Sequence, residues 1–302
     1  MLANPAIIIN AASGTADKEA LRDSLLEMFS SRGLVPEISL VRRGRELRPL
    51  AEQKLSAGHS PIIAGGGDGT ISTVASVLTD TGTPLGILPL GTLNHFAKDL
   101  KIPLDTEGAV AVILNGSIAG VDVGEVNGHV FINNSSLGLY PSIVHRRQQQ
   151  QHRLGWGKWP AFLWAAWSVL RRYPFLDVRL VADTKALKRR TPFVFIGNNE
   201  YEMEGVRIGA RSCLNAGKLS LHVARRTGRW GLVRFTIRAL LGTLANEKDL
   251  DSMCSEEVWI ETRHKLLRVA TDGEVTLMET PLHYRIRPEA LQVLVPCRKD
   301  EG

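Results

Sequence analysis

Four glycines surround one carboxylate in the segment 65–70, which reads GGGDGT. The short apolar run at 61–64 predicts a strand that enters this segment, and apolar positions from 71 to 78 recur at the spacing of a helix that leaves it. Ligands of open α/β sheets bind at the carboxyl ends of strands, where a backbone without Cβ atoms lets amides approach phosphate oxygens. The segment therefore predicts a phosphate site. A tight strand–helix turn in which Asp68 caps the helix is the alternative.

Asp68 is the one charged residue of this segment. A carboxylate repels a polyanion unless Mg²⁺ or a donor hydroxyl lies between them. The segment has neither the Lys-Ser/Thr of a Walker A motif nor the GxGxxG spacing of a dinucleotide-binding loop. These features favour metal-assisted phosphoryl transfer.

The elements that position the segment alternate along the first part of the chain. Strands are expected at 6–10, 37–41, 61–64 and 85–88, with helices at 18–31, 47–55 and 71–78 between them. This order predicts a parallel sheet with helices on both faces, and hence an α/β domain at 1–120.

A different pattern begins after about residue 120. Short segments with turn residues between many of them suggest an antiparallel sandwich or barrel at 121–294, and the tail 295–302 is a candidate for return to the first domain. The expected strands are 120–126, 129–133, 176–181, 193–196, 218–223, 258–261, 266–271 and 282–286, with helical insertions near 141–173 and 228–247.

Composition limits the class of protein. The chain has 302 residues, of which 44% are hydrophobic and 23% charged, and its net charge of +6 favours anionic partners. The three cysteines are far apart, which argues against a disulfide framework or a zinc site. The N-terminus lacks a leader pattern and the apolar run 160–170 is too short to span a membrane, so we expect a soluble cytoplasmic protein.

Five motifs in order give a resemblance to a known family. GGGDGT is followed by PLGTLNHFAKDL at 89–100, preceded by NAASG at 10–14, and accompanied by NNSSLGLYPSIV at 133–144 and TDGEV at 271–275. Together they resemble the diacylglycerol kinase catalytic-domain family. That family includes bacterial lipid kinases and, more distantly, sphingosine and ceramide kinases.

The resemblance implies a fold and a reaction. The fold would be a phosphofructokinase-like α/β domain that binds ATP, followed by a β-rich sandwich-like domain, with the active site in the cleft between them. The reaction would be transfer of the ATP γ-phosphate, with Mg²⁺, to a hydroxyl of diacylglycerol or a related lipid. The lipid itself is not identified by these motifs.

The resemblance also implies roles for particular residues. Asp272 would be the general base and Asp68 a second catalytic residue, with Glu274 beside the base near the nucleotide or metal. The nucleotide would be bound by Asn10, Ser13, Gly14, Gly65, Gly66, Gly67, Gly69, Thr70, Thr92 and Asn94. The alternative for Asp272 is an Asp-Gly turn that joins the strand 266–270 to the strand 275–278.

The chain departs from the family pattern at three positions. His95 replaces an Asp and Ala11 replaces a Pro. The late Asp-Asp-Gly, linked in bacterial members to a structural Mg²⁺, is here Asn215-Ala216-Gly217. Because a hard divalent cation prefers carboxylates, we do not predict the structural metal site. The catalytic Mg²⁺ on ATP is a separate ion and remains expected.

Two acid-free stretches carry the excess of positive charge. Residues 142–176 contain six Lys or Arg and four tryptophans, and residues 218–241 contain six more basic residues. They fit peripheral contact with an anionic membrane surface, or core packing of the aromatic residues below solvated arginines. No nucleic-acid motif accompanies them.

Two other functions remain possible from the sequence, and so does a homodimer. The departures at His95 and Asn215-Ala216-Gly217 allow a non-catalytic nucleotide or lipid sensor that keeps the kinase fold. NAD kinase shares a GGDG loop, although GTLNHFAKDL fits lipid kinases better. An exposed edge strand in the second domain would make a homodimer unsurprising.

Overall fold

The computed structural model describes residues 4–12, 17–138, 175–182, 185–199, 201–202, 210–211, 215–224 and 250–297. The contacts divide the chain into two compact units. The first comprises Met1–Val123 and Pro288–Gly302, and the second Gly124–Arg287. Ser13, Gly14, the two expected helical insertions and most of the two basic stretches lie outside the described residues.

The first unit contains a parallel sheet. Strands β1 (Ala6–Asn10), β2 (Glu37–Val41), β3 (Ile62–Gly66) and β4 (Leu85–Pro89) pair in the order β2-β1-β3-β4. Strands β1, β3 and β4 are almost wholly buried, as expected when helices cover both faces of a parallel sheet. The α/β architecture predicted from the alternating pattern is confirmed.

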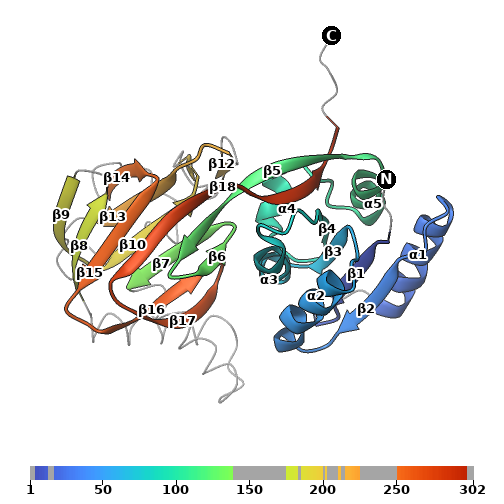
Figure 1. Ribbon diagram of the computed structural model, residues 1–302, viewed down its shortest axis with the longest axis horizontal. Coiled ribbons are helices and arrows are strands. Elements are labelled where there is room, and N and C mark those ends of the chain that lie inside the picture. Colours follow the sequence, from blue (N-terminus) through green and yellow to red (C-terminus); the bar gives the residue numbers. More distant parts are fainter. Residues whose placement is uncertain are drawn as a thin grey trace, which may run out of the picture. The chain divides into compact units, whose positions relative to one another are not determined.

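Helices cover this sheet, with α2 and α3 on one side of the strands and α1 and α5 on the other (Figure 1). The helices are α1 (Lys18–Ser30), η1 (Gly44–Glu46), α2 (Leu47–Ser56), α3 (Asp68–Leu78), α4 (His95–Asp99) and α5 (Thr106–Asn115). Helix α1 begins after Asp17, whose side chain accepts from the N–H of Glu19 at 2.9 Å. Helix α3 begins at Asp68, earlier than the apolar spacing indicated, so part of the glycine segment is itself helical.

Two long strands, β5 (Ser117–Val126) and β18 (Leu282–Val295), contribute residues to both units. In the first unit the later part of β18 lies parallel to β4, with Val293 opposite Leu85. From the sequence, the strand was expected over 282–286 and the tail 295–302 was the candidate for return to the first domain. Pro288 has no N–H for a strand ladder, which disfavours a continuous strand at this point. The strand instead continues through Pro288 to Val295, and Glu289, the residue after the proline, adopts a φ of 48°.

The second unit is a sandwich of two antiparallel sheets. One sheet runs from the first part of β18 through β15 (Glu257–Thr262) and β8 (Leu176–Ala182) to β9 (Lys185–Thr191), and β5 pairs with β6 (His129–Phe131). The other follows the order β14 (Leu250–Ser255), β13 (Leu219–Ala224), β10 (Phe193–Asn198), β7 (Asn134–Gly138), β16 (Leu266–Thr271) and β17 (Glu274–Glu279). A short pair, β11 (Tyr201–Glu202) and β12 (Ala210–Arg211), lies apart from them.

The core of this sandwich draws on both sheets. Val178 and Ile260 come from one sheet, and Leu137 and Leu221 from the other. Tyr284 is fully buried, its hydroxyl lies 3.0 Å from the Ser135 hydroxyl, and burial raises the pKa of Tyr284. The β-rich sandwich expected for the second domain is confirmed.

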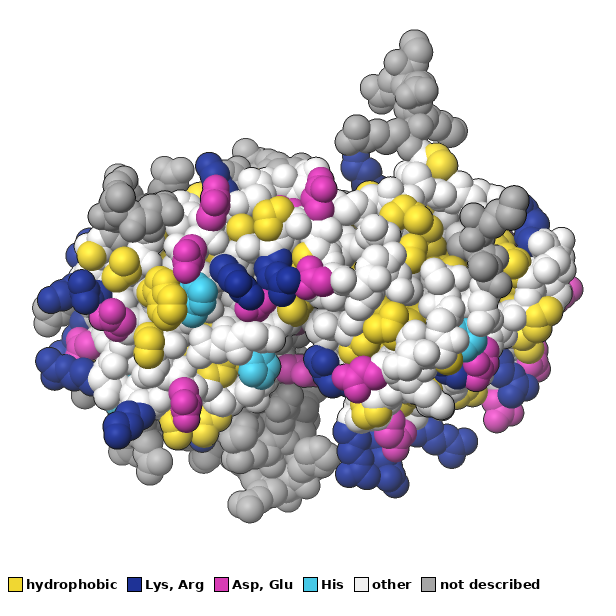
Figure 2. Space-filling model, viewed as in Figure 1, with side chains coloured by type: hydrophobic (Ala, Val, Ile, Leu, Met, Phe, Trp, Pro, Cys, Tyr) yellow, Lys and Arg dark blue, Asp and Glu magenta, His cyan; other side chains and the backbone are white. Residues whose placement is uncertain are grey.

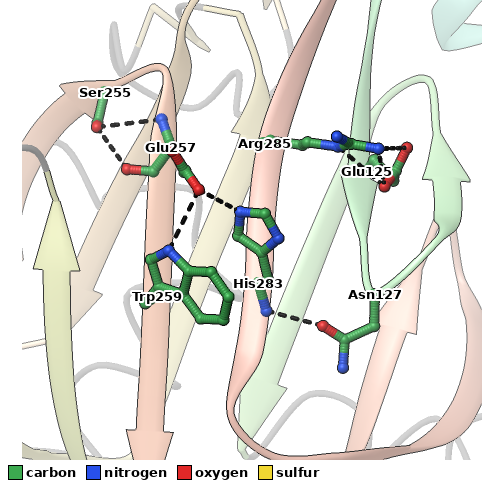
Figure 3. Close-up of polar contacts among 7 residues, drawn as sticks. All are labelled: Glu125, Asn127, Ser255, Glu257, Trp259, His283 and Arg285. Carbon is green, nitrogen blue, oxygen red and sulfur yellow. Dashed lines mark hydrogen bonds and ion pairs between the residues drawn. The ribbon is translucent and has the colours of Figure 1, made fainter.

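The opposite face of the β18–β15 pair carries polar and aromatic contacts (Figure 3). Trp259 stacks on His283 with ring centroids 4.0 Å apart, and both rings contact the Glu257 carboxylate. Arg285 donates two hydrogen bonds to Glu125, at 3.0 and 3.1 Å. These contacts neutralise charges within this part of the sheet surface.

None of the helices among the described residues is both long enough and apolar enough to cross a bilayer.

Candidate active site

The glycine segment forms the passage from β3 to α3 at the carboxyl edge of the parallel sheet. Gly67 is the N-cap of α3, in an extended conformation, and no side chain caps the helix. The N–H groups of Thr70 and Ile71 both bond to the Gly67 carbonyl. The N–H groups of Asp68 and Gly69 have no acceptor in the described part of the chain. With the positive end of the helix dipole, they form a site suited to an anion.

Packing requires glycine at some positions of this region and not at others. A Cβ on Gly66 would lie 2.5 Å from Thr70 Oγ1, and a Cβ on Gly91 would lie 2.4 Å from the Gly67 Cα. Packing therefore demands glycine at 66 and 91. A Cβ on Gly67 would make only an ordinary contact at 3.4 Å, and one on Gly69 would meet nothing within 4 Å.

Neither Gly67 nor Gly69 has a positive φ, so backbone strain does not require glycine there. Their missing side chains leave open space over the N-terminus of α3. A phosphate group bound to the Asp68 and Gly69 amides needs that space.

Polar side chains surround this N-terminus. Asn10, at the end of β1, donates from Nδ2 to Thr70 Oγ1 at 3.0 Å. Asp68 is half-buried, and its Oδ1 accepts the N–H of Phe96 in α4 at 3.2 Å. No second partner of the Asp68 carboxylate occurs among the described residues. Asp68 therefore links α3 to α4 and is not the cap of its own helix, because Gly67 holds that position.

The turn after β4 is organised by Asn94. This residue is buried with φ 51°, its Oδ1 accepts from Gly91 N at 3.0 Å, and its Nδ2 donates to the carbonyls of Pro89 and Gly91. Its side chain thus shapes the loop that packs on Gly67, whereas Thr92 is exposed. The sequence signal for this role was available, since Asn is among the few residues that tolerate this backbone conformation.

Asp272 lies in the second unit, at the tip of the β16–β17 hairpin. Thr271 pairs with Glu274 across a two-residue turn, and Asp272 and Gly273 have φ values of 48° and 87°. Two positive φ values are the signature of a type I′ hairpin turn, so the Asp-Gly turn that was the alternative for Asp272 is present. Glu274 is exposed beside it.

The Asp272 carboxylate also holds a distant segment. It accepts the N–H groups of Ile132 and Asn133 at 2.8 Å and that of Asn134 at 3.0 Å, while Asp272 N donates to the Asn134 carbonyl. Asn198 donates from Nδ2 to the Ile132 carbonyl at 2.9 Å. Three N–H donors favour the ionised carboxylate. The motif at 133–144 pointed to this segment, but nothing in the sequence pointed to its bonds with Asp272.

The structure thus brings together Asn10, Asp68, Thr70, Gly91 and the glycine segment in the first unit. Asp272 and Glu274 form a separate group in the second unit. The Asn215-Ala216-Gly217 loop is held by a bond from Ala216 N to Asn199 Oδ1 at 2.9 Å. Within the described ranges, no group of three His, Cys, Asp or Glu side chains could hold a metal ion.

The chain thus combines a glycine-rich helix N-terminus on a parallel sheet with a β-sandwich in a second unit. The family model "Diacylglycerol kinase catalytic domain" matches residues 4–126, and "YegS C-terminal NAD kinase beta sandwich-like domain" matches residues 140–295. A crystal structure of a diacylglycerol kinase from Bacillus anthracis, 19% identical, covers 97% of this chain and 96% of its own with a TM-score of 0.69.

Curated relatives carry the name "Probable lipid kinase YegS-like". The protein of Yersinia pestis (strain Pestoides F) is 39% identical over 280 residues, 87% of this chain and 88% of its own length. That of Pseudomonas savastanoi pv. phaseolicola is 27% identical over 289 residues, 93% and 91% of the two chains. The chain therefore belongs to the diacylglycerol kinase catalytic-domain family, among the YegS-like lipid kinases. The resemblance predicted from these motifs is confirmed.

Proposed function

We propose that the protein transfers the γ-phosphate of ATP to a hydroxyl group of diacylglycerol or a related membrane lipid. The observation that carries this proposal is the N-terminus of α3, where two amides have no acceptor among the described residues and packing does not require glycine at 67 or 69. Family membership supports phosphoryl transfer to a lipid in general. Diacylglycerol itself is our inference.

The nucleotide would bind through the first unit. The Asp68 and Gly69 amides would hold phosphate oxygens, while Asn10 and Thr70 fix the edge of the site through their mutual hydrogen bond. Mg²⁺ bound to the ATP phosphates would neutralise charge that develops during transfer. Asp68 fits as the residue that holds this ion, because one of its oxygens is fixed by Phe96 and no described residue engages the other.

Asp272 would accept the proton of the lipid hydroxyl. Its three N–H donors keep it ionised but also make it a weak base. A weak base is sufficient here, because phosphoryl transfer depends mostly on positioning and electrostatic stabilisation and the proton is removed late. Glu274 would lie near the nucleotide or the metal.

The lipid substrate sets where the protein must act. We propose that it works at the cytoplasmic surface of a membrane as a peripheral protein, where basic stretches would contact anionic headgroups. Formation of a homodimer stays a prediction. Sedimentation of the purified protein would measure its oligomeric state.

The decisive experiment incubates the folded protein with labelled ATP, Mg²⁺ and a total lipid extract, followed by mass spectrometry of phosphorylated products. We expect a phosphorylated lipid in the parent reaction, and strongly reduced product with Asp68→Asn. Absence of any labelled lipid, with Mn²⁺ also tried, would contradict the proposal. Addition of NAD to a parallel reaction tests NAD kinase, which the description of the second matched domain makes the natural competitor.

A non-catalytic sensor is the second candidate function. The observation that favours it is the structural use of the Asp272 carboxylate, which is already engaged by three backbone N–H groups. The sensor predicts ATP binding without turnover in the parent protein. Turnover by the parent protein rejects the sensor.

A further inference from the structure

The surface of the second unit has a hollow with no role in the proposed reaction. It has a volume of ≈ 500 Å³ and lies over strands β8, β9 and β15. Its lining residues are Asp177, Val178, Arg179, Lys188, Arg189, Arg190, Glu261, Thr262 and Arg263. None of them belongs to the candidate active site.

The lining is strongly cationic, with five Lys or Arg against two carboxylates. Arg179 lies directly opposite Lys188 in the β8–β9 register. Like charges at opposite positions of an antiparallel pair destabilise a sheet unless a counter-charge is near. Figure 2 shows Lys and Arg side chains gathered at the left edge of the molecule, where β8 and β9 lie in Figure 1.

Only part of this charge is balanced by the protein. Arg179 pairs with Glu261 at 3.1 Å, and Arg189 pairs with Asp251 at 3.3 Å. Within the described ranges, Lys188 and Arg263 have no ion pair. Arg285 of the same sheet differs, because it is paired with Glu125. The unbalanced cations of this sheet therefore include two that line the hollow.

Protection of a sheet edge is the simplest alternative explanation. Charged residues on an edge strand prevent pairing with other chains, and β9 is the end strand of its sheet. This explains Lys188, but Arg179 lies on β8, which pairs with strands on both sides, and Arg263 follows β15. The cations come from β8, from β9 and from the residue after β15, which edge protection does not require.

We propose that this hollow binds a phosphate group, as a site additional to the nucleotide site of the first unit. Guanidinium groups match phosphate oxygens with paired hydrogen bonds, and Lys188 adds a point charge. Arg190 lies 5.1 Å from the centroid of the Phe175 ring, a contact that restrains its side chain. The phosphate can belong to an anionic lipid headgroup or to a soluble compound, and the chemistry of recognition is the same for both.

The test removes two of the cations that have no ion pair within the described ranges, with the double variant Lys188→Gln/Arg263→Gln. The matched control, Lys265→Gln/Arg268→Gln, removes equal charge from exposed positions of the same unit outside the hollow. One arm measures sedimentation with phosphatidylglycerol-containing vesicles against pure phosphatidylcholine vesicles. The other measures binding of inorganic phosphate and glycerol 3-phosphate by calorimetry.

We expect the double variant to bind at least one phosphate probe roughly 10-fold more weakly than the parent, while the control stays within about 2-fold. Loss in the vesicle arm alone assigns the site to a lipid headgroup, and loss in the soluble arm alone assigns it to a free phosphate compound. Equal behaviour of both double variants, or no binding of either probe by the parent, overturns the proposal. All four side chains are exposed and have no ion pair within the part of the chain that the structure describes, so thermal melts should be unchanged. If the double variant melts at a lower temperature than the parent, Lys188→Gln alone takes its place.

Discussion

The glycine segment of the first unit and the Asp272 turn of the second use backbone N–H groups in opposite ways. In the first, the amides of Asp68 and Gly69 have no acceptor in the described part of the chain. In the second, three consecutive N–H groups from Ile132 to Asn134 end on one carboxylate. The amides at the N-terminus of α3 leave positive potential for an external anion. The amides of Ile132–Asn134 already bind an anion of the protein itself, the Asp272 carboxylate.

The two regions therefore suit different tasks: the first can bind an anion, and the second holds a carboxylate in a fixed position. Glycine at the N-cap of α3 gives up only a few tenths of a kcal/mol of the stability that a capping side chain would have supplied. The second unit, by contrast, gains from each charge-assisted hydrogen bond while it fixes the position of Asp272. The open amides can bind phosphate, whereas Asp272 can supply a fixed negative charge. The following changes test that division.

The largest effect is expected from Asp272→Ala, which removes the shared acceptor of three N–H groups. Hydrogen bonds to a charged group contribute about 1.5–3 kcal/mol each and do not add fully, so we expect about 4 kcal/mol of lost stability. Ala also tolerates φ 48° less well than Asp. Urea denaturation followed by tryptophan fluorescence measures this loss, because all six tryptophans belong to the second unit.

Asp272→Asn is the companion to this variant. It keeps the side-chain shape and tolerates the turn, but its amide group faces N–H donors with a donor of its own. We expect about 2 kcal/mol of destabilisation. Kinase assays of either variant must therefore be corrected for the folded fraction. Parent-like stability of Asp272→Ala would show that the three hydrogen bonds do not hold the segment.

Gly91→Ala should disturb the first unit next most strongly. The new Cβ would lie 2.4 Å from the Gly67 Cα and 2.8 Å from Asn94 Oδ1, so the backbone around the glycine segment has to move. We expect about 2–3 kcal/mol of lost stability together with loss of ATP binding. Hydrogen exchange in β1 and β3 and calorimetry with ATP would detect the two effects. Retained ATP affinity would mean that the packing of Gly91 on Gly67 does not shape the site.

Gly69→Ala sharpens the comparison, because it should affect binding alone. Nothing lies within 4 Å of the added methyl group, and Ala in place of Gly in a helix favours folding by up to about 1 kcal/mol. The methyl group would occupy space that a phosphate on the Gly69 amide needs, so we expect roughly 10-fold weaker ATP binding, about 1.4 kcal/mol. Gly44→Ala is the matched control, since its Cβ is equally unobstructed and lies outside the site. Unchanged ATP affinity in Gly69→Ala would remove this amide from the proposed site.

Much of this arrangement follows from local sequence patterns. The four glycines, the strand before them and the helix after them place the amides correctly, because each depends on residues close in the chain. The Asp272-Gly273 turn follows for the same reason, since two positive φ values favour this residue pair. Local chemistry was sufficient for these elements.

What the sequence did not predict depends on distant pairing. The bonds from Ile132–Asn134 to Asp272 join segments about 140 residues apart, and only the β7–β16 register brings them together. The continuation of β18 through Pro288 depends on pairing with β4. Helix α5 was also not expected, although Asp105 caps it with a 2.7 Å bond to Gly108 N. The sequence does carry signals for this helix, namely the capping Asp105 and the apolar residues from Ala109 to Ile113.

The smallest expected effect is a difference between the two units in how their folding stability responds to acid. In the second unit, burial lowers the pKa of His222 from its ordinary value of 6.5, and its Nδ1 lies 2.8 Å from Ser252 Oγ. The folded state therefore binds the proton less readily than the unfolded state, so this stabilisation is complete above pH 6.5 and is lost as pH falls below it. In the first unit, the Lys54 hydrogen bond lowers the pKa of Glu37 from 4.5, so its stabilisation persists until pH falls below that value.

Acidification from pH 7.5 to 5.5 should thus weaken the second unit before the first. Urea midpoints from tryptophan fluorescence should fall over this range, while the hydrogen-exchange protection factors of β1 and β3, corrected for the intrinsic pH dependence of exchange, stay constant. His222→Gln should flatten the fluorescence response, because a neutral side chain cannot take up the proton. His264→Gln, a change at an exposed position of the same unit, should not. A parent midpoint independent of pH, or an equal slope in His222→Gln, would show that this buried imidazole does not set the acid stability of the sandwich.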